Sequence, residues 1–212
     1  EFSLLNTLRH KFATNYHVKD FELSQNYLFF WDKIERANMF YRNVEETARQ
    51  PISDRLVQFL FANPGEDGGQ WAMAASLVQK YGVVPASVMP ETFNTTNTSD
   101  FQEVMSRKLR KDGLKLRQLV MDGADEAELQ SLEKSMLQEV YRIAVYSFGE
   151  PPTTFDLEYR DDDKKYHREA QLTPQAFYQN YFETDLDDYV VVTNSPDTVS
   201  YTHLRAHETL AN

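Results

Sequence analysis

The stretch Asn63-Pro-Gly-Glu-Asp-Gly-Gly-Gln-Trp71 places three glycines within five positions of a chain that has only seven. Glycine has no side chain, so another backbone can approach Gly68 and Gly69 and pair with their N–H and C=O groups. Trp71 follows as a large aromatic anchor, and we expect its ring to pack beneath the loop. The sequence therefore predicts the rim of a cleft that binds an extended ligand backbone. A tight turn that binds nothing is the alternative.

A helical pattern begins where this loop ends. Apolar residues recur at i, i+3 and i+4 spacing from Trp71 to Tyr81. Gly82 then ends the helix, because glycine takes the left-handed conformation most easily, and Pro85 favours an extended chain before it. We expect a helix over 70–81 and a shorter one over 53–62, so that the glycine-rich loop joins two helices.

The same periodicity extends over the rest of the first 148 residues. Apolar stripes at helical spacing are typical of helices packed on a core. Ser24 and Asp125 are good N-caps, and Gly149 with Pro151-Pro152 stops the last helix. The predicted helices are 2–13, 24–49, 99–121 and 125–148.

The pattern changes to strands after the Pro151-Pro152 break. Residues 153–159 alternate like a half-buried strand, and a second strand passes through Tyr166 and His167. Asp161-Asp162-Asp163 between them reads as a charged turn, because consecutive aspartates cannot all face one metal ion. A short helix from Thr173 and a buried strand over 189–193 complete this part. The sequence thus predicts an α+β chain with a subdomain boundary near residue 149.

Several segments carry a family resemblance in combination. Phe21-Glu-Leu-Ser-Gln-Asn-Tyr27, Asp67-Gly-Gly-Gln-Trp71, Lys80-Tyr-Gly-Val-Val-Pro85 and Glu158-Tyr-Arg-Asp-Asp-Asp163 occur in this order. The succession resembles the aminopeptidase C and bleomycin hydrolase family, a branch of the papain-like cysteine peptidases, from Phe2 to about Ser195. The resemblance implies that Gly68 and Gly69 hydrogen-bond the substrate backbone as an added strand would.

The resemblance also implies a papain-like fold and a division into parts. Residues 1–148 would form the helical subdomain with a helical insertion around 99–148, and 149–199 would begin the β subdomain. Residues 200–212 resemble translated sequencing-adapter sequence, and we expect a non-native tail there. His203, His207 and Glu208 in that tail have the spacing of a zinc pair, but no acidic residue lies between the histidines as in a metalloprotease helix.

The family's nucleophile lies in a Cys-Trp-x-Phe motif, and Phe2 matches its phenylalanine. The chain contains no cysteine, so the resemblance puts the nucleophile and the oxyanion-hole glutamine before Glu1, and the base histidine and its asparagine beyond residue 212. We therefore expect a fragment of a cysteine aminopeptidase, which removes N-terminal residues from peptides by thiolate acyl transfer. The fragment holds none of the catalytic residues, and we expect it to be inactive.

The composition of the chain disfavours several classes of binding partner. The formal charge of −11 disfavours nucleic acid, which attracts basic surfaces. No apolar run reaches the ~18 residues of a membrane span, and without cysteine there is no thiolate metal site. We expect no metal, no cofactor and a cytoplasmic location. The resemblance implies peptide substrates and a homo-oligomer, usually a hexameric barrel.

A basic run over 107–117 stands out in this acidic chain. It fits a charged surface that faces a channel or a partner, or simply a solvated helix face. The alternative function is therefore a non-enzymatic helical interaction module that uses the helix 99–121. A cysteine-tryptophan pair encoded immediately before Phe2 would favour the peptidase.

Overall fold

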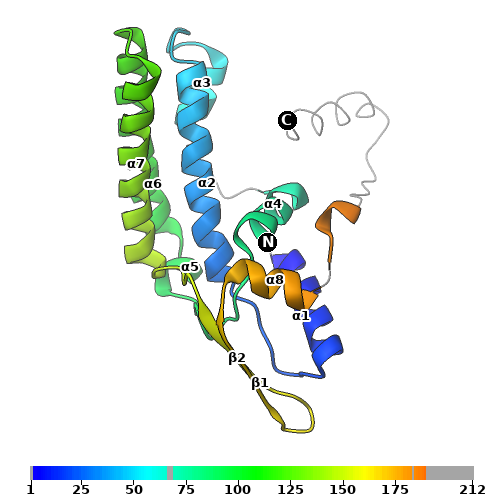
Figure 1. Cartoon of the computed structure of the whole chain (residues 1–212). Coiled ribbons are helices and arrows are strands. Elements are labelled where there is room, and N and C mark those ends of the chain that lie inside the picture. The colour runs from blue at the N-terminus through cyan, green and yellow to red at the C-terminus, as the bar shows by residue number, and fades with distance from the viewer. Residues whose placement is uncertain (1, 66–68, 183, 190–212) are drawn as a thin grey trace.

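The computed structural model describes residues 2–65, 69–182 and 184–189. The described part holds eight α-helices, one antiparallel strand pair and one short 3-10 helix (Figure 1). Their bounds are α1 Phe2–Tyr16, α2 Gln25–Glu46, α3 Arg55–Ala62, α4 Trp71–Tyr81, α5 Phe93–Thr96, α6 Ser99–Met121, α7 Glu126–Phe148, β1 Phe155–Arg160, β2 Tyr166–Leu172, α8 Pro174–Phe182 and η1 Leu186–Asp188.

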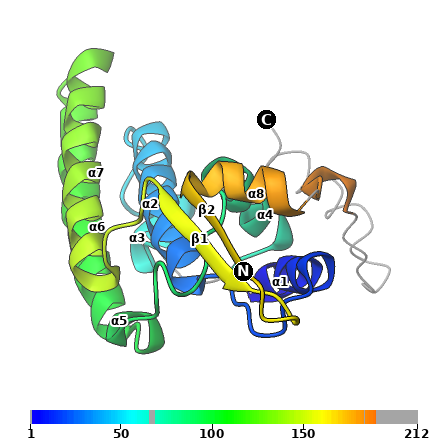
Figure 2. The same cartoon turned by 60° about the horizontal axis from the view of Figure 1, so that its bottom comes forward.

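The molecule has a tall part and a compact part. Figure 1 shows α2, α6 and α7 side by side as an upright bundle, with α3 beside its upper end, while α1, α4 and α8 gather next to its base. Turning the molecule brings the hairpin of β1 and β2 to the front, and it runs from the foot of α7 across to α1 (Figure 2). The glycine-rich loop, which leaves α3 and enters α4, thus connects the two parts.

The predicted change from helices to strands is confirmed. Among the described residues no strand precedes β1, apart from an isolated bridge between Leu23 and Pro85. α1 continues to Tyr16, beyond the predicted end at residue 13, and α2 ends earlier than predicted, at Glu46. Beyond Glu46 the backbone tightens into i→i−3 turns, with Ala48 N donating to Glu45 O at 3.1 Å and Gln50 N donating to Thr47 O at 3.0 Å. The boundaries of the predicted subdomains stay a prediction.

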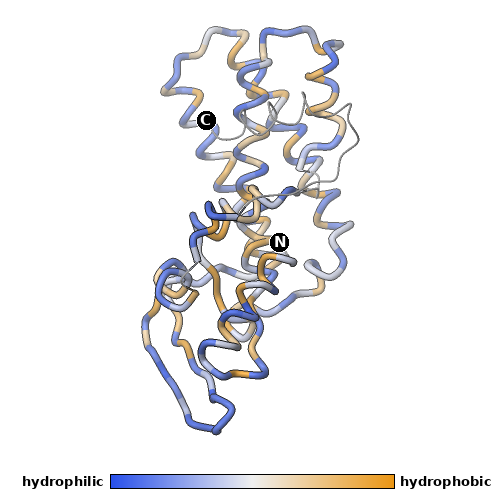
Figure 3. Tube along the Cα trace, turned by 90° about the vertical axis from the view of Figure 1, so that its right-hand side faces the viewer, coloured by the Kyte–Doolittle hydropathy of each residue, from blue (hydrophilic) through white to orange (hydrophobic). Residues whose placement is uncertain are grey.

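The bundle is held by an amphipathic pattern and by one polar network. Along its helices, apolar positions alternate with hydrophilic ones (Figure 3). The buried Tyr41 hydroxyl of α2 donates to Asp112 Oδ2 of α6 at 2.7 Å. Lys108 donates to Asp112 Oδ1 at 2.8 Å and pairs with Glu139 of α7 at 2.6 Å. The network therefore links α2, α6 and α7 to one another at the same height along the bundle axis.

Aromatic packing holds the compact part together. The Phe12 ring of α1 stacks on Phe21 at 4.0 Å between centroids, and meets Tyr159 of β1 and Phe177 of α8 edge-on. Such pairs contribute about 0.5–1.5 kcal/mol each beyond the area that they bury. A single ring thus joins α1 to the hairpin and to α8.

Two of the segments that carry the resemblance lie against each other. Ser24 N donates to Val84 O, and Ala86 N donates to Glu22 O, both at 2.8 Å. Ser24 also caps α2, since its side chain accepts from Tyr27 N. The chain before α2 is therefore paired with the chain after α4, which fixes the position of α4 beside α2.

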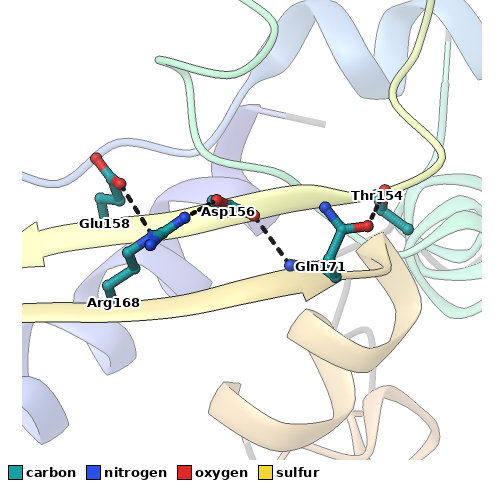
Figure 4. A network of polar contacts seen from close by, with 5 residues as sticks. All are labelled: Thr154, Asp156, Glu158, Arg168 and Gln171. Carbon is teal, nitrogen blue, oxygen red and sulfur yellow. Dashed lines mark hydrogen bonds and ion pairs between the residues drawn. The ribbon is translucent and has the colours of Figure 1, made fainter.

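The hairpin carries an exposed polar network on one face (Figure 4). Arg168 pairs with Asp156 at 2.6 Å and with Glu158 at 3.4 Å, while Gln171 N donates to Asp156 Oδ1 at 3.0 Å. The hydrogen bond from Arg168 holds the pKa of the Asp156 carboxyl below its usual range. These contacts are screened by solvent, and they align the strands more than they stabilise the fold.

The three consecutive aspartates form the predicted turn between β1 and β2. Asp161 accepts from Lys165 N at 2.9 Å, and its other oxygen contacts His167 Nε2 at 2.8 Å. Both partners belong to the hairpin, so Asp161 serves the turn itself. The strand predicted over 189–193 falls outside the described residues after Tyr189, and so does the tail 200–212 with His203, His207 and Glu208.

Candidate functional site

The glycine-rich loop has the predicted place between two helices. It begins after α3, which ends at Ala62, and it ends at Trp71, the first residue of α4. Of the two predicted substrate-binding residues, Gly68 lies outside the described residues and Gly69 is exposed at the surface. The site is therefore described by Gly69 and by the residues that hold the two ends of the loop.

The entry to the loop rests on α6. Gly65 has a φ of +78°, a conformation that favours glycine, and a side chain there would meet Leu109 Cδ1 of α6 at 3.3 Å. Gln102 Nε2 donates to Gly65 O at 2.9 Å, and Ser106 Oγ donates to Pro64 O at 3.3 Å. One face of α6 thus binds the first residues of the loop.

The exit from the loop rests on α2. An ideal Cβ at Gly69 would lie 3.6 Å from Arg36 Nη2, an ordinary van der Waals distance. Arg36 Nε in turn donates to Asp32 Oδ2 at 2.6 Å, and the Asp32 side chain is only 7% exposed. Lys33 approaches the same carboxylate at 3.6 Å. A buried carboxylate with two cations thus fixes the guanidinium beside Gly69.

Gly69 borders a hollow of about 240 Å³ between α2 and the start of α4, lined by Phe29, Asp32, Arg36, Gly69, Gln70, Met73 and Ala74. A second hollow of about 230 Å³ continues along the same two helices and shares Asp32, Arg36, Gln70 and Met73 with the first. Ligand pockets in proteins usually reach ~300 Å³ or more. Each hollow alone is therefore too small for a whole peptide.

The far end of the second hollow is electrostatically neutralised. Lys80 Nζ lies 2.5 Å from Glu35 Oε1, and the Tyr81 hydroxyl donates to the same carboxyl oxygen. Burial alone would raise the pKa of Glu35, but the hydrogen bonds from Lys80 and Tyr81 outweigh burial and lower it. Burial and the Glu35 carboxylate raise the pKa of Tyr81, so its hydroxyl stays a donor.

Trp71 is half-buried at the start of α4. Its ring lies 5.5 Å from the Tyr189 ring, which ties α4 to the residues that follow η1. The predicted packing of Trp71 beneath Gly68 falls outside the described residues. The indole thus anchors the helix start, and its relation to the loop stays a prediction.

The basic run 107–117 is largely bound within the chain. Arg110 donates from Nε to Phe61 O at 2.9 Å and from Nη2 to Ala62 O at 2.6 Å. The buried Arg117 donates to Thr47 O at 2.9 Å and to Gln50 O at 2.6 Å. These two cations cap the ends of α3 and α2, where helices leave carbonyl groups unsatisfied.

Comparison with known proteins assigns the family. A family model described as the Peptidase C1-like family matches residues 1–212. The chain belongs to the Peptidase C1-like family. Within this family it is 56% identical over 196 residues to aminopeptidase G of Lactobacillus delbrueckii subsp. lactis, covering 92% of this chain and 45% of that protein. It is 47% identical over 195 residues to aminopeptidase C of Lactobacillus helveticus, covering 92% of this chain and 43% of that protein.

A solved relative supports the fold of this Peptidase C1-like chain. The crystal structure of PepW from Lactobacillus rhamnosis HN001 superposes with a TM-score of 0.85 at 52% sequence identity, over 87% of this chain and 42% of that one. The family resemblance and the papain-like α+β fold class are therefore confirmed. The chain spans about 45% of the length of the curated relatives. None of the helices within residues 2–65, 69–182 and 184–189 combines the length and the hydropathy that a membrane span requires.

Proposed function

We propose that this chain is part of a cysteine aminopeptidase that removes N-terminal residues from peptides, with Gly68 and Gly69 binding the substrate backbone. The relatives' names, aminopeptidases G, E, W and C, support the activity. The observation that supports the site is the glycine-rich loop between α3 and α4, whose exposed Gly69 borders the hollow beside α2. An extended peptide can pair with such a backbone edge.

The chemistry of this proposal needs groups from outside residues 1–212. A thiolate attacks the peptide carbonyl, and hydrogen-bond donors stabilise the oxyanion that forms. The C–N bond then breaks as a protonated histidine gives its proton to the leaving amine, and water hydrolyses the thioester, which releases the N-terminal residue and restores the thiolate and the protonated histidine. Residues 1–212 hold no cysteine, so they contribute substrate binding and support rather than the nucleophile. We further propose that no cofactor takes part and that the protein acts in the cytoplasm as a homo-oligomer, in the form of a hexamer.

The proposal is tested with two proteins, residues 1–212 alone and a version extended at both ends to the length of the relatives, here called the extended protein. The extended protein is expected to release N-terminal residues from fluorogenic aminoacyl substrates and to lose that activity with a thiol-blocking reagent. Residues 1–212 alone are expected to be inert, because the catalytic groups act as a unit. Thiol-sensitive turnover by residues 1–212, or no turnover by the extended protein, would contradict it.

Gly69→Val tests the site within the extended protein. The Cβ itself has room, 3.6 Å from Arg36 Nη2, but the two added methyl groups reach into the space of a bound backbone. The Michaelis constant is expected to rise about tenfold with little change in kcat. Gly69→Ala, which adds only the tolerated Cβ, is the matched control and should change it less. An unchanged Michaelis constant in Gly69→Val removes Gly69 from the site.

A further inference from the structure

The carbonyl groups at the entry to the glycine-rich loop are bound by three side chains of α6 at intervals of four residues. Gln102, Ser106 and Arg110, here called the α6 brace, lie on one face of the helix because four residues make about one turn. Together they donate to the carbonyl groups of four residues, Phe61, Ala62, Pro64 and Gly65. The brace therefore follows the chain from the last turn of α3 into the loop.

Each bond of the brace has a defined geometry. The Gly65 carbonyl oxygen can only accept, so the nitrogen of the Gln102 amide must face it, at 2.9 Å. Arg110 uses two nitrogens of its planar guanidinium on two adjacent carbonyl groups, at 2.9 and 2.6 Å. A planar two-nitrogen contact fixes direction as well as distance. The brace thus determines where the chain leaves α3, and at which angle.

The brace is itself attached to a rigid frame. α6 packs against α2 and α7, and the network of Tyr41, Asp112 and Lys108 fixes the position of α6 along the bundle axis. Gly113 lets α6 approach α2 and α3 closely, because a Cβ there would lie 3.0 Å from Phe40 Cζ of α2 and 2.9 Å from Phe61 Cζ of α3. At the exit of the loop Gly69 lies near Arg36 of α2, since an ideal Cβ at Gly69 would be 3.6 Å from Arg36 Nη2, and α2 belongs to the same bundle.

We infer that α6 positions the chain where it enters the glycine-rich loop, from Phe61 to Gly65, and that this placement serves peptide binding, with Gln102, Ser106 and Arg110 as positioning residues. The inference rests on the proposed function, since it assigns them a role through Gly69. The bundle thereby takes part in substrate binding, since the brace binds carbonyl groups at the entry to the loop. A hydrogen bond from such a side chain contributes to binding only through the placement of the loop.

The test compares matched substitutions on one helix of the extended protein. Gln102→Met and Arg110→Met are each expected to raise the Michaelis constant about fivefold with kcat changed less than twofold, as loss of a typical hydrogen bond permits. Gln118→Met and Arg107→Met are the controls. Gln118 donates to Asp122, and Arg107 pairs with Glu103, so both lie on α6 without touching the loop, and neither should change the Michaelis constant.

A second measurement separates placement from general stability. Amide hydrogen exchange at Gly65, Gly69 and Gln70 is expected to accelerate in Gln102→Met and Arg110→Met, and to stay unchanged in the two controls. Arg110→Lys keeps the charge but only one contact, so its effect should be intermediate, and it replaces Arg110→Met if that variant does not fold. In a Gly69→Val background, Gln102→Met should add little, because both changes act through one loop.

The outcomes distinguish the two proposals. If Gly69→Val raises the Michaelis constant but the α6 variants leave it unchanged, the positioning role is wrong while the proposed site stands, whatever the exchange rates show. An equal rise in the controls also overturns the positioning role. If Gly69→Val itself has no effect, Gly69 is not in the site, and the role of the brace in peptide binding fails with it.

Discussion

Gly82→Ala is expected to lower the free energy of unfolding of the extended protein by about 4 kcal/mol, the sum of backbone strain and overpacking. Gly82 has a φ of +75°, and an added Cβ would lie 2.2 Å from both the carbonyl carbon and oxygen of Pro174. No atom fits at that distance, so the start of α8 would have to move away from the end of α4. The loss is large against the ~5–15 kcal/mol of a typical domain.

The movement would reach the aromatic core. Val83 N donates to Pro174 O at 3.3 Å, and Phe177, one turn along α8, is fully buried against Phe12 and Phe21. Displacing Pro174 therefore disturbs both the hydrogen bond and the packed rings. Thermal and urea unfolding followed by circular dichroism would measure the loss.

Gly123→Ala is the matched control for that prediction. Gly123 has a φ of +84° but nothing lies within 4 Å of its added Cβ, so this change tests backbone strain alone, about 1 kcal/mol. The difference between the two variants isolates the contact with α8. Equal losses in both variants would show that Pro174 can move aside freely.

The sequence predicted the features that depend on local patterns. The helix from Trp71 ends at Gly82 as expected, because the chain leaves it there with a φ of +75° and a ψ of −159°, a conformation that only glycine adopts readily. Likewise the Asp125 cap and the Gly149 stop of α7 were predicted from neighbouring residues. Local chemistry fixes such ends, and periodicity shows which faces are buried.

The supports of the candidate site could not be predicted in this way. Gln102 binds Gly65 across 37 positions, and Arg110 binds Phe61 across 49. No local pattern distinguishes these side chains from other polar residues on α6. Arg117 belongs to the basic run that the sequence offered as a charged surface, but it is buried and donates to Thr47 O just beyond the end of α2. The role of Arg117 depends on a contact between residues far apart in the chain, and a single sequence does not show such contacts.

Asp112→Ala is expected to destabilise the extended protein by about 3–5 kcal/mol, the usual cost of removing one member of a buried charged network. Asp112 is only 4% exposed and Tyr41 is fully buried. Without the carboxylate, the Tyr41 hydroxyl loses its acceptor, and Lys108 keeps only Glu139 as a charged partner. Burial and the Asp112 hydrogen bond raise the pKa of Tyr41, so the hydroxyl remains a donor in need of an acceptor.

A double-mutant cycle with Tyr41→Phe tests whether the network acts as a unit. Tyr41→Phe alone should cost about 1–3 kcal/mol, because the buried Asp112 Oδ2 loses the hydroxyl donor and keeps only Lys108, at 2.7 Å. In the Asp112→Ala background it should cost almost nothing, since the hydroxyl is already unpaired there. Glu139→Ala is the control, because the Glu139 side chain is 54% exposed and water can replace it at Lys108. Additive losses in the cycle, or an equally large loss in the control, would show that Asp112 stabilises the bundle by some means other than this network.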